Sequence, residues 1–406
     1  MGDYKEPFKK LKPPLGAGGF ATTWKARVLD PYLIKKWGVQ EVAIKIPLSK
    51  EKERILKEEV TRNIELRLQL TEQESVNIVG YLDFEVFDGT LVMVMKYIKE
   101  GSLRKIIGGI GDWRRIEINR AVRIARGVLK GLSIIHRKHI VHRDIKPENI
   151  LMDGEVPKIA DFGISKMLNT NELASTTVGT LYYMSPELLY EKSDFNTDIW
   201  SFGVTFYEML CGQFPFGMRK ETPPGAIMDL IKSDGSKLIF PDEANIPVPL
   251  QNIMSKSLIK DPKKRYQTAD EMLHDLRKYY KDDDDIYVDR CGDEIRELFN
   301  AGKIKEAEER WKEVVKKYPQ NPASYLGLGE FYNKCLQYKE AIQVFRKGIQ
   351  HCPECALLCR DLALSLNAMN LKGEAISAMK KAKDLGLEKR LQKQAEDILK
   401  RWEHKY

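Results

Sequence analysis

The residues with the clearest capacity for chemistry lie in two short segments, which begin at His142 and at Asp161. The first segment reads His-Arg-Asp-Ile-Lys-Pro-Glu-Asn and the second reads Asp-Phe-Gly. The first carries the carboxylate of Asp144, the ammonium group of Lys146 and the amide of Asn149. The second adds another carboxylate. This set suits a metal-assisted transfer of a phosphoryl group, in which positioning and charge neutralisation provide most of the catalysis.

The length and composition are those of a globular protein with two or three domains. The 406 residues are long for a single core, and the chain is 43% hydrophobic and 31% charged. The net charge of +8 has its signs interleaved, which argues against a nucleic-acid partner or a membrane surface. No run of about 18 apolar residues exists, the first residues do not form a secretory signal, and the six cysteines are spread as reduced thiols would be. We therefore expect a cytoplasmic protein with no membrane span.

The two segments resemble the catalytic loop and the magnesium-binding motif of the protein kinases, and Lys146 matches the serine/threonine version of that loop. The resemblance implies that Asp144 orients the substrate hydroxyl and accepts its proton, while Lys146 faces the γ-phosphate. It implies ATP as the nucleotide, with Asn149 and Asp161 as ligands of Mg²⁺ (or Mn²⁺), an ion that prefers oxygen ligands. For His142 we favour a packing role over a role as acid or base.

The elements that must position these groups begin with a glycine-rich segment. Its glycines would let backbone amides close over phosphates, although a plain β-turn explains such a run equally well in isolation. The segment resembles the nucleotide-covering loop of the kinases, with Ala21 in place of the third glycine and Thr23 in place of the valine that covers the adenine. The residues assigned to nucleotide binding on this basis are Leu15, Gly16, Ala17, Gly18, Gly19, Phe20 and Thr23.

A short Val-Ala-Ile-Lys strand ends in Lys45, which by resemblance pairs with the nucleotide phosphates and with a glutamate of the next helix. The spacing of apolar residues predicts that helix over about residues 50–70. We choose Glu59 because it lies within the apolar stripe, whereas Glu58 and Glu65 point largely away. Counting back from the next motif favours Glu65 instead, so both alternatives stay open.

An apolar strand that ends at Met95 leads, by resemblance, into the hinge between two lobes. Met95 would flank the adenine pocket, and backbone groups of Lys96 and Ile98 would bond the adenine edge. Ser102 could reach the ribose. These four residues complete the expected nucleotide site.

The segment after Asp-Phe-Gly resembles the activation segment of the kinases. Arg143 immediately precedes the catalytic aspartate, and in the family this arrangement marks enzymes that are activated by a phosphate in that segment. An arginine can grip such a phosphate and order the segment. Thr176 is at the best distance, with Thr177 as the alternative, whereas we expect Thr180 to bridge Asp144 and Lys146.

Three further expectations concern the scaffold. The helix that contains Asp198 should be buried, with its carboxylate bracing the catalytic-loop backbone, and Glu187 should form an ion pair with Arg265. Residues 30–39 are an insertion relative to the family, and we expect a surface loop that packs Trp37 back onto the protein.

The last third of the chain repeats itself. Ala307, Ala341 and Ala375 each follow a Lys/Gly-Glu pair at a spacing of 34 residues. The period and the surrounding pattern resemble tetratricopeptide repeats, which are helix pairs stacked into a solenoid. We expect three repeats over residues 291–387 and a capping helix over 388–406.

The predicted fold class is α+β: a bilobal protein-kinase fold followed by an all-α tetratricopeptide solenoid. The kinase domain should occupy residues 1–280, with the smaller, β-rich lobe at about 10–95 and the larger, helical lobe at about 99–280. A charged linker is expected at 281–290.

The predicted function is that of a serine/threonine protein kinase that acts on protein substrates and binds a peptide or protein on the concave face of its repeats, with a dimer also possible. The alternative is a pseudokinase scaffold that works through its repeats. The presence of Lys45, Asp144, Asn149 and Asp161 together argues for the enzyme.

Overall fold

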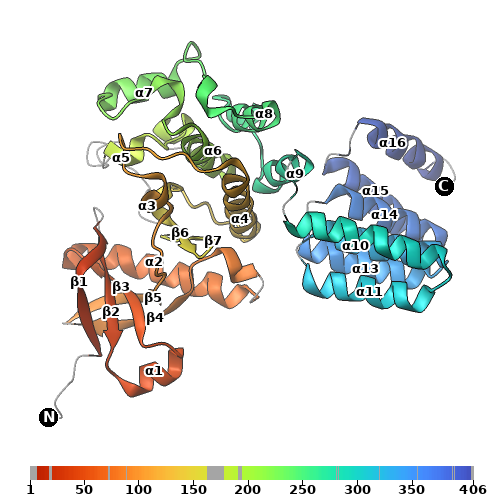
Figure 1. Cartoon of the computed structure of the whole chain (residues 1–406), viewed down its shortest axis with the longest axis horizontal. Helices are drawn as coiled ribbons and strands as arrows, with labels where there is room; N and C mark the ends of the chain where they lie inside the picture. The colour runs from red at the N-terminus through yellow and green to blue at the C-terminus, as the bar shows by residue number, and fades with distance from the viewer. Residues whose placement is uncertain are drawn as a thin grey trace. The chain divides into compact units, whose positions relative to one another are not determined.

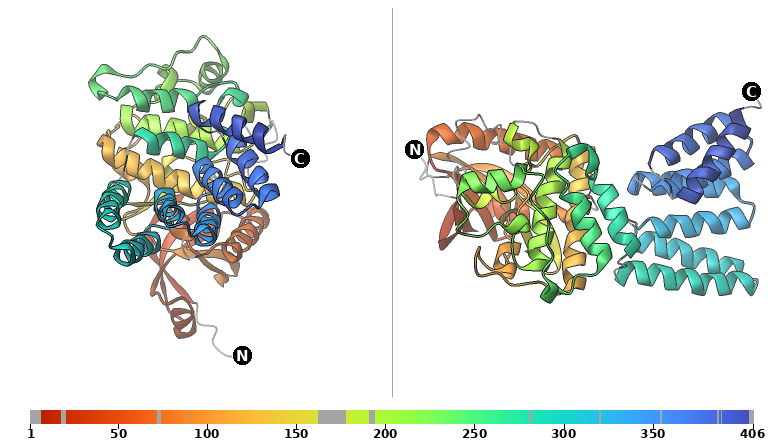
Figure 2. Two further views of the ribbon diagram at one scale, coloured as in Figure 1. Left: turned by 90° about the vertical axis from the view of Figure 1, so that its right-hand side faces the viewer. Right: turned by 90° about the horizontal axis from the view of Figure 1, so that it is seen from above.

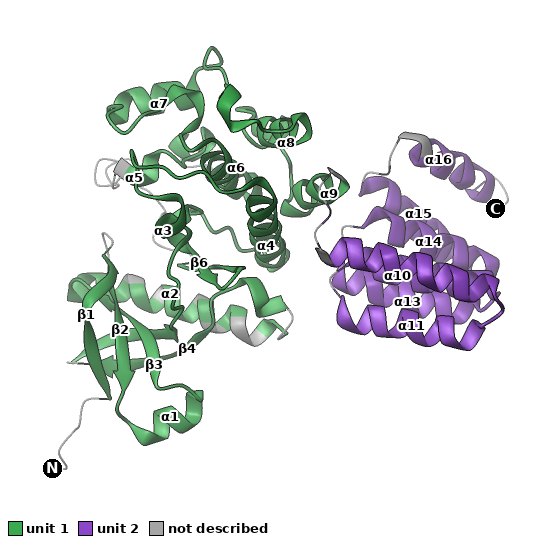
Figure 3. Ribbon diagram, in the orientation of Figure 1, with its two compact units in different colours: residues 1–279 green, residues 280–406 purple. Residues whose placement is uncertain are grey.

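The computed structural model forms two compact units, residues 1–279 and 280–406 (Figures 1 and 3). None of the helices in the described part of the chain combines the length and apolar character that crossing a bilayer requires. The structure describes residues 7–17, 21–71, 74–87, 89–161, 178–190, 194–279, 281, 283–319, 321–353, 355–385, 387 and 389–403.

The smaller lobe of the first unit is a five-stranded antiparallel sheet with the strand order β1-β2-β3-β5-β4 (Figure 1). Successive side chains of a strand point to opposite faces, so Val42 and Ile44 are buried in the core on one face. Ala43 and Lys45 are thereby presented to the other face. The strands are β1 (Phe8–Ala17), β2 (Ala21–Val28), β3 (Glu41–Pro47), β4 (Tyr81–Phe87) and β5 (Thr90–Lys96).

The insertion at residues 30–39 contains helix α1 (Pro31–Trp37) instead of the expected surface loop. The side chain of Asp30 caps its first turn, and a proline occupies its first position, where a fixed φ favours a helix. Trp37 does pack against the sheet, because its ring stacks on that of Phe8 with 6.1 Å between the ring centroids. The insertion therefore extends the core of the smaller lobe.

Helix α2 (Lys50–Gln69) packs against β3, β4 and β5. Its Leu56 and Val60 are buried, and Asn63 contacts Met93 of β5. Glu59 is buried on this side of the helix.

The larger lobe is built around helix α6 (Phe195–Cys211), which is buried on all sides from Thr197 to Cys211. A helix that is mainly apolar all round belongs in a core. It packs against α4 (Ile118–Arg137). The hairpin of β6 (Ile150–Asp153) and β7 (Val156–Ile159) follows the loop of residues 142–149, which is named the catalytic loop for its resemblance to that of the kinases. The other α-helices are α3 (Leu103–Ile107), α5 (Val178–Leu181), α7 (Pro224–Lys232), α8 (Val248–Ser257) and α9 (Ala269–Tyr279).

The second unit is all-helical in its described residues, and its consecutive helices pack side by side (Figure 2). Ala307, Ala341 and Ala375 lie on every second helix and are fully buried. Small residues let neighbouring helices approach: a Cβ at Gly329 would lie 2.2 Å from the ring of Phe345. The helices are α10 (Asp283–Asn300), α11 (Ile304–Lys317), α12 (Pro322–Lys334), α13 (Tyr338–His351), α14 (Ala356–Ala368), α15 (Lys372–Asp384) and α16 (Lys389–Glu403).

In place of the charged linker expected at residues 281–290, helix α10 begins at Asp283. Val288, Cys291 and Ile295 recur at helical spacing and are each 1% exposed in the core of the second unit. The acidic run stands at the N-terminus of this helix, where negative charge interacts favourably with the helix dipole. The linker predicted from the charged composition of this run is therefore wrong, because the run lies at the start of helix α10.

Because α10 belongs to the core of the second unit, a chain that ends after Lys281 should fold as an independent domain. We expect a cooperative thermal transition, followed by circular dichroism, within a few degrees of the corresponding transition of the full chain. The matched control ends after Asn300, which leaves the apolar side of α10 uncovered and should lower solubility. A chain of residues 1–281 that failed to fold would show that the second unit is required for the first.

Candidate active site

Strand pairing places three of the expected nucleotide-binding residues in one row. Gly16 of β1 is opposite Thr23 of β2, and Thr23 is opposite Lys45 of β3. Directly opposite residues in an antiparallel pair lie about 4.5–5.5 Å apart, so a ligand across the sheet can meet all three. Of the other residues predicted in the glycine-rich segment, Leu15 and Ala17 are exposed on β1. Gly18, Gly19 and Phe20 lie outside the described residues.

Lys45 joins the two lobes. Its Nζ lies 2.8 Å from Oε1 of Glu59 on α2 and 3.1 Å from Oδ1 of Asp161. Burial alone would lower the pKa of Lys45, but the charges of Asp161 and Glu59 outweigh burial and raise it. The lysine is therefore charged at neutral pH. Of the alternative partners, Glu65 is exposed.

The catalytic loop holds its carboxylate between two donors. Lys146 Nζ lies 3.0 Å from Asp144 Oδ1 and 2.9 Å from Thr180 Oγ1. Asn149 Nδ2 donates to the carbonyl oxygen of Asp144 at 2.8 Å and to its Oδ2 at 2.9 Å. The carboxylate is thus fixed in direction while its side chain remains partly accessible, at 16%. Thr180 makes the expected contact with Lys146.

Buried Asp198 braces the backbone of this loop. Its Oδ2 accepts a hydrogen bond from the amide of His142 at 2.8 Å, and its Oδ1 accepts one from the amide of Arg143 at 2.7 Å. His136 Nε2 lies 2.8 Å from Oδ2 as well. Burial alone would raise the pKa of Asp198, but these partners lower it. The carboxylate therefore stays ionised at neutral pH, as its three partners require.

His142 connects the catalytic loop to the segment before Asp161. Its Nε2 lies 2.9 Å from the carbonyl oxygen of Ala160, and the amide of Asp144 donates to its Nδ1 at 3.3 Å. Complete burial lowers the pKa of His142, so the ring is neutral at neutral pH. The two contacts then require a proton on Nε2 and a lone pair on Nδ1. This is the packing role expected for His142.

Two residues of the site adopt a left-handed backbone that non-glycine residues rarely adopt: Arg143 with φ 66° and Asp161 with φ 55°. Such strain costs about 1–3 kcal/mol per residue and persists where surrounding contacts fix the conformation. Asp198 holds the amide of Arg143, and the amide of Asp161 donates to Tyr81 Oη at 3.2 Å. Tyr81 is a positioning residue that the sequence did not reveal, because it begins an ordinary strand.

The hinge residues surround the end of β5. Met95 is buried, and the amide of Lys96 donates to the carbonyl of Gly80 at 2.8 Å. Ile98 is buried just beyond. Ser102 precedes α3 without using its hydroxyl as a cap. The backbone of Ser102 forms an isolated antiparallel β-bridge with Leu151 of β6. Leu151 is half-buried beside the hinge, and the sequence did not predict this neighbour.

A charged network below the catalytic loop was not foreseen either. Arg104 Nε lies 2.9 Å from Glu148 Oε1, and its Nη1 lies 2.6 Å from Oε1 of fully buried Glu208 on α6. Tyr183 and Trp113 also donate to Glu208, at 2.5 and 2.9 Å. Arg104 thereby connects the residue before Asn149 to the central helix. Arg104 and Glu208 are 104 residues apart, so no local spacing could indicate this contact.

The expected ion pair of the larger lobe is present. Arg265 Nη1 lies 2.7 Å and its Nη2 lies 3.1 Å from the two carboxylate oxygens of Glu187. The side chain of Arg265 is completely buried, so this bidentate pair is protected from solvent. The phosphosite candidates Thr176 and Thr177 lie outside the described residues.

The oxygen donors near Asp144 fit a hard divalent cation. Asn149 uses its Nδ2 for Asp144, so its amide oxygen is the atom available for coordination. Asp161 contacts Lys45 through Oδ1 and has a second carboxylate oxygen, on a side chain that is 36% exposed. An amide oxygen and a carboxylate are the ligands that Mg²⁺ accepts together with water and phosphate.

Comparisons with known proteins found a matching family model, similar sequences and a similar solved structure. Residues 10–276 match the model of the family described as "Protein kinase domain". Two proteins named "Probable serine/threonine-protein kinase" are similar to this chain. The protein from Clostridium acetobutylicum is 32% identical over 68% of this chain and 41% of its own length. The protein from Clostridium perfringens is 34% identical over 66% of this chain and 38% of its own length. The chain thus spans about two fifths of the length of these relatives. Among solved structures, Rad53 residues 1–466 with AMP-PNP matches at 25% identity and a TM-score of 0.49, covering 66% of this chain and 64% of that one.

The lowered pKa of His142 predicts a specific dependence of stability on pH. Below about pH 6.5, His142 binds a proton in the unfolded chain but remains neutral in the folded chain. The free energy of unfolding therefore falls as the pH decreases. Urea unfolding of residues 1–281 at pH 7.5 and 5.5 should show a loss about 1 kcal/mol smaller in His142→Gln than in the unsubstituted chain. The matched control is His274→Gln, which removes a histidine at an exposed position. Equal losses in all three proteins would mean that His142 titrates alike in both states.

Proposed function

Because the chain belongs to the protein kinase domain family, we propose that it is a serine/threonine protein kinase that transfers the γ-phosphate of ATP to hydroxyl groups of proteins. The observation that carries this proposal is the carboxylate of Asp144, held by Lys146 and Asn149 beside the Lys45–Asp161 pair. Positioned carboxylates and ammonium groups are what phosphoryl transfer requires of a protein.

The nucleotide would lie between the lobes, against the row formed by Gly16, Thr23 and Lys45. The charge of Lys45, aligned by Glu59, suits phosphate oxygens. Met95 would contact the adenine, and the backbone carbonyl of Lys96 would accept a hydrogen bond from it. The hydroxyl of Ser102, which does not cap helix α3, would bond to the ribose. The magnesium ion, held by Asn149 and Asp161, would neutralise charge on the phosphates.

In the transfer step, the substrate hydroxyl oxygen bonds to the γ-phosphorus as the bond from that phosphorus to the bridging oxygen of ADP breaks. Asp144 orients the hydroxyl and accepts its proton. Lys146 lies beside Asp144 and supplies positive charge where negative charge spreads over the transferred group. Thr180 keeps Lys146 in place through its hydroxyl.

We also propose that a phosphate on Thr176, or on Thr177, activates the enzyme. Arg143 supports this proposal, because its backbone is fixed by Asp198 while its side chain is half-buried beside the catalytic loop. A guanidinium group binds a phosphate with paired hydrogen bonds and can order the segment that carries it.

For the second unit we propose three tetratricopeptide repeats that bind a protein or peptide ligand. The supporting observations are the 34-residue spacing, the alternating helices and the buried alanines at the repeated position. The pairs would be α10 with α11, α12 with α13, and α14 with α15, and α16 would cap the array. Helices α10, α12 and α14 contact one another in order, as the first helices of stacked repeats do.

The proposed base can be tested directly. Asp144→Asn keeps a hydrogen-bonding group of the same shape but cannot accept the proton, so transfer of labelled phosphate from ATP and Mg²⁺ to serine and threonine peptides should fall about 10²–10⁴-fold. Nucleotide affinity should change less than about twofold. The control is Asp153→Asn, an exposed carboxylate on β6, which should leave transfer unchanged. Full transfer by Asp144→Asn would exclude this residue as the base, and a wild-type chain that binds nucleotide but transfers nothing would favour a scaffold.

Activation can be tested through coupled substitutions. Incubation with ATP and Mg²⁺ should place phosphate on Thr176 or Thr177, identified by mass spectrometry, and replacing both with alanine should lower transfer about tenfold or more. Arg143→Gln should have a similar effect and add little in the triple variant, because the groups act as one unit. Additive losses would contradict the proposed contact.

A further inference from the structure

Tyr81, the first residue of β4, points to the ligand side of the sheet because the pairing of β4 with β5 is irregular. Tyr81 pairs with Met95, and the next residue on the same face, Phe84, pairs with Met93. The step along β4 is three residues while the step along β5 is two, so β4 contains one extra residue, a β-bulge that re-aims the side chains beside it. Directly paired residues share a face, and Met93 also pairs with Lys45. The bulge therefore turns Tyr81 to the face that carries Lys45.

On that face, the hydroxyl of Tyr81 contacts the backbone of Asp161. The amide of Asp161 donates to Tyr81 Oη at 3.2 Å, and the tyrosine is only 6% exposed. Asp161 has a left-handed φ of 55°, which a residue with a Cβ keeps only where other contacts hold it. Its Oδ1 contacts Lys45 Nζ at 3.1 Å. Tyr81 thus holds the backbone of Asp161 and Lys45 holds its side chain, which together fix the position of the second carboxylate oxygen.

The chain that leads into Asp161 is held by backbone hydrogen bonds. The amide of Val79 donates to the carbonyl of Ile159 at 2.9 Å, and the amide of Ala160 donates to the carbonyl of Asn149 at 2.8 Å. The second bond ties Asn149 to the residue that precedes Asp161, so the backbones of the two expected metal ligands are linked. At Asp161 itself the amide bonds to a side-chain hydroxyl, which a single substitution can remove while the other bonds remain.

We propose that Tyr81 is a positioning residue that sets the affinity of the site for Mg²⁺, because its hydroxyl holds Asp161 in the backbone conformation in which it can bind the ion together with Asn149. The inference rests on the proposed kinase function and assigns to this chain a determinant of its metal affinity. When the competent conformation is less populated, the apparent affinity falls by the same factor. A hydrogen bond between neutral groups shifts such an equilibrium by about twofold to tenfold.

The test measures the effect of Mg²⁺ separately from catalysis, on the full chain with the variant Tyr81→Phe, which removes the hydroxyl and keeps the ring. A labelled, non-hydrolysable ATP analogue is bound with and without saturating Mg²⁺, and its affinity is measured by fluorescence anisotropy. The factor by which Mg²⁺ strengthens binding should be about threefold to tenfold smaller in Tyr81→Phe. The affinity without Mg²⁺ should change less than about twofold, because the adenine contacts at the hinge do not involve the hydroxyl.

Two further measurements on the same proteins separate positioning from a general structural role. Hydrogen exchange of the Asp161 amide, resolved by mass spectrometry with fragmentation, should be faster in Tyr81→Phe because its hydrogen bond is lost. In transfer to a short peptide, Tyr81→Phe should need about threefold to tenfold more Mg²⁺ for the half-maximal rate. The rate at saturating Mg²⁺ should return to within about twofold of the wild-type rate.

The matched control is Tyr207→Phe, which removes a buried hydroxyl that donates to the backbone carbonyl of Ile239 in the larger lobe. This variant should leave the effect of Mg²⁺ unchanged, and thermal unfolding shows whether both variants are folded. An unchanged effect of Mg²⁺ in Tyr81→Phe, or an equal loss in Tyr207→Phe, would overturn the proposal.

A larger effect of Mg²⁺ in Tyr81→Phe would also overturn the proposal, by showing that the hydroxyl holds Asp161 away from the ion. A rate that stays low at saturating Mg²⁺ would do the same, because the hydroxyl would then act in the transfer step. A wild-type chain that binds the analogue more tightly with Mg²⁺ but transfers no phosphate would refute the kinase activity alone, since the binding measurements do not depend on transfer.

Discussion

The candidate site depends on the buried carboxylate of Asp198. It stands on a helix that is enclosed on every side, and it accepts hydrogen bonds from two consecutive backbone amides, those of His142 and Arg143, and contacts the imidazole of His136. Removing a carboxylate from water is costly unless hydrogen bonds replace the lost solvation, and here three do. Asp198 holds the amide of Arg143, whose backbone is left-handed and which directly precedes Asp144, so the interaction that replaces the lost solvation of Asp198 also stabilises the loop that carries Asp144.

Lys45 extends this order from one lobe to the other. Its ammonium group contacts a carboxylate from the smaller lobe, Glu59, and one from the larger lobe, Asp161. Two carboxylates around one buried lysine leave a net negative charge, which favours binding of cations near Asp161. A movement of α2 would shift Glu59 and therefore Lys45, which contacts Asp161. The carboxylate of Asp161 could thus change position while the catalytic loop stays in place.

The sequence predicted those site residues that belong to short, contiguous motifs. Lys45, Asp144 and Asn149 belong to dense motifs, and the structure brings them to one place with the contacts described above. Arg104 and Glu208 were missed, because their contact depends on the fold and is not encoded in any local spacing. The start of α10 was missed for another reason: an acidic run looks like a solvated linker, although the same charges favour the first turn of a helix. Helix α1 was missed because residues 30–39 were interpreted only as an insertion, although Asp30 followed by a proline is typical of a helix start.

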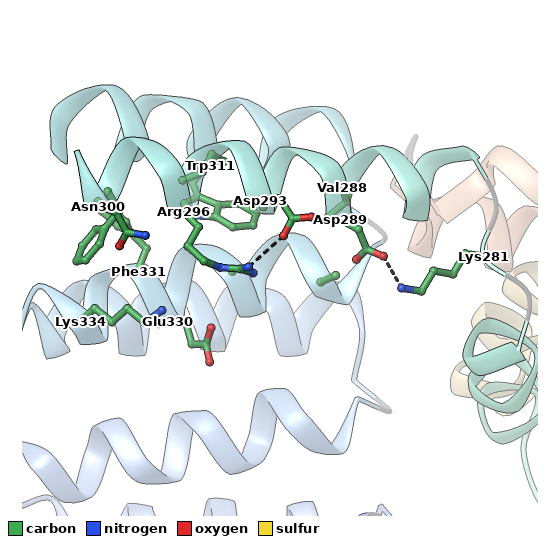
Figure 4. A pocket seen from close by; sticks show the side chains of 15 residues that line it. Lys281, Val288, Asp289, Asp293, Arg296, Asn300, Trp311, Glu330, Phe331 and Lys334 are labelled. Atoms are coloured by element: carbon green, nitrogen blue, oxygen red, sulfur yellow. Dashed lines mark hydrogen bonds and ion pairs between the residues drawn. The ribbon is translucent and has the colours of Figure 1, made fainter. Parts of the chain in front are cut away.

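Gly292 also has a consequence for the stability of the second unit. Glycine in the interior of a helix costs roughly 1 kcal/mol relative to alanine, and Gly292 lies in the middle of α10, where a methyl group would meet no clash. The chain therefore retains a residue that weakens its own helix at a place where a stronger one would fit. Replacement of Gly292 by alanine should therefore raise the thermal stability of the second unit, because the added methyl group would make only ordinary contacts with Trp311 (Figure 4).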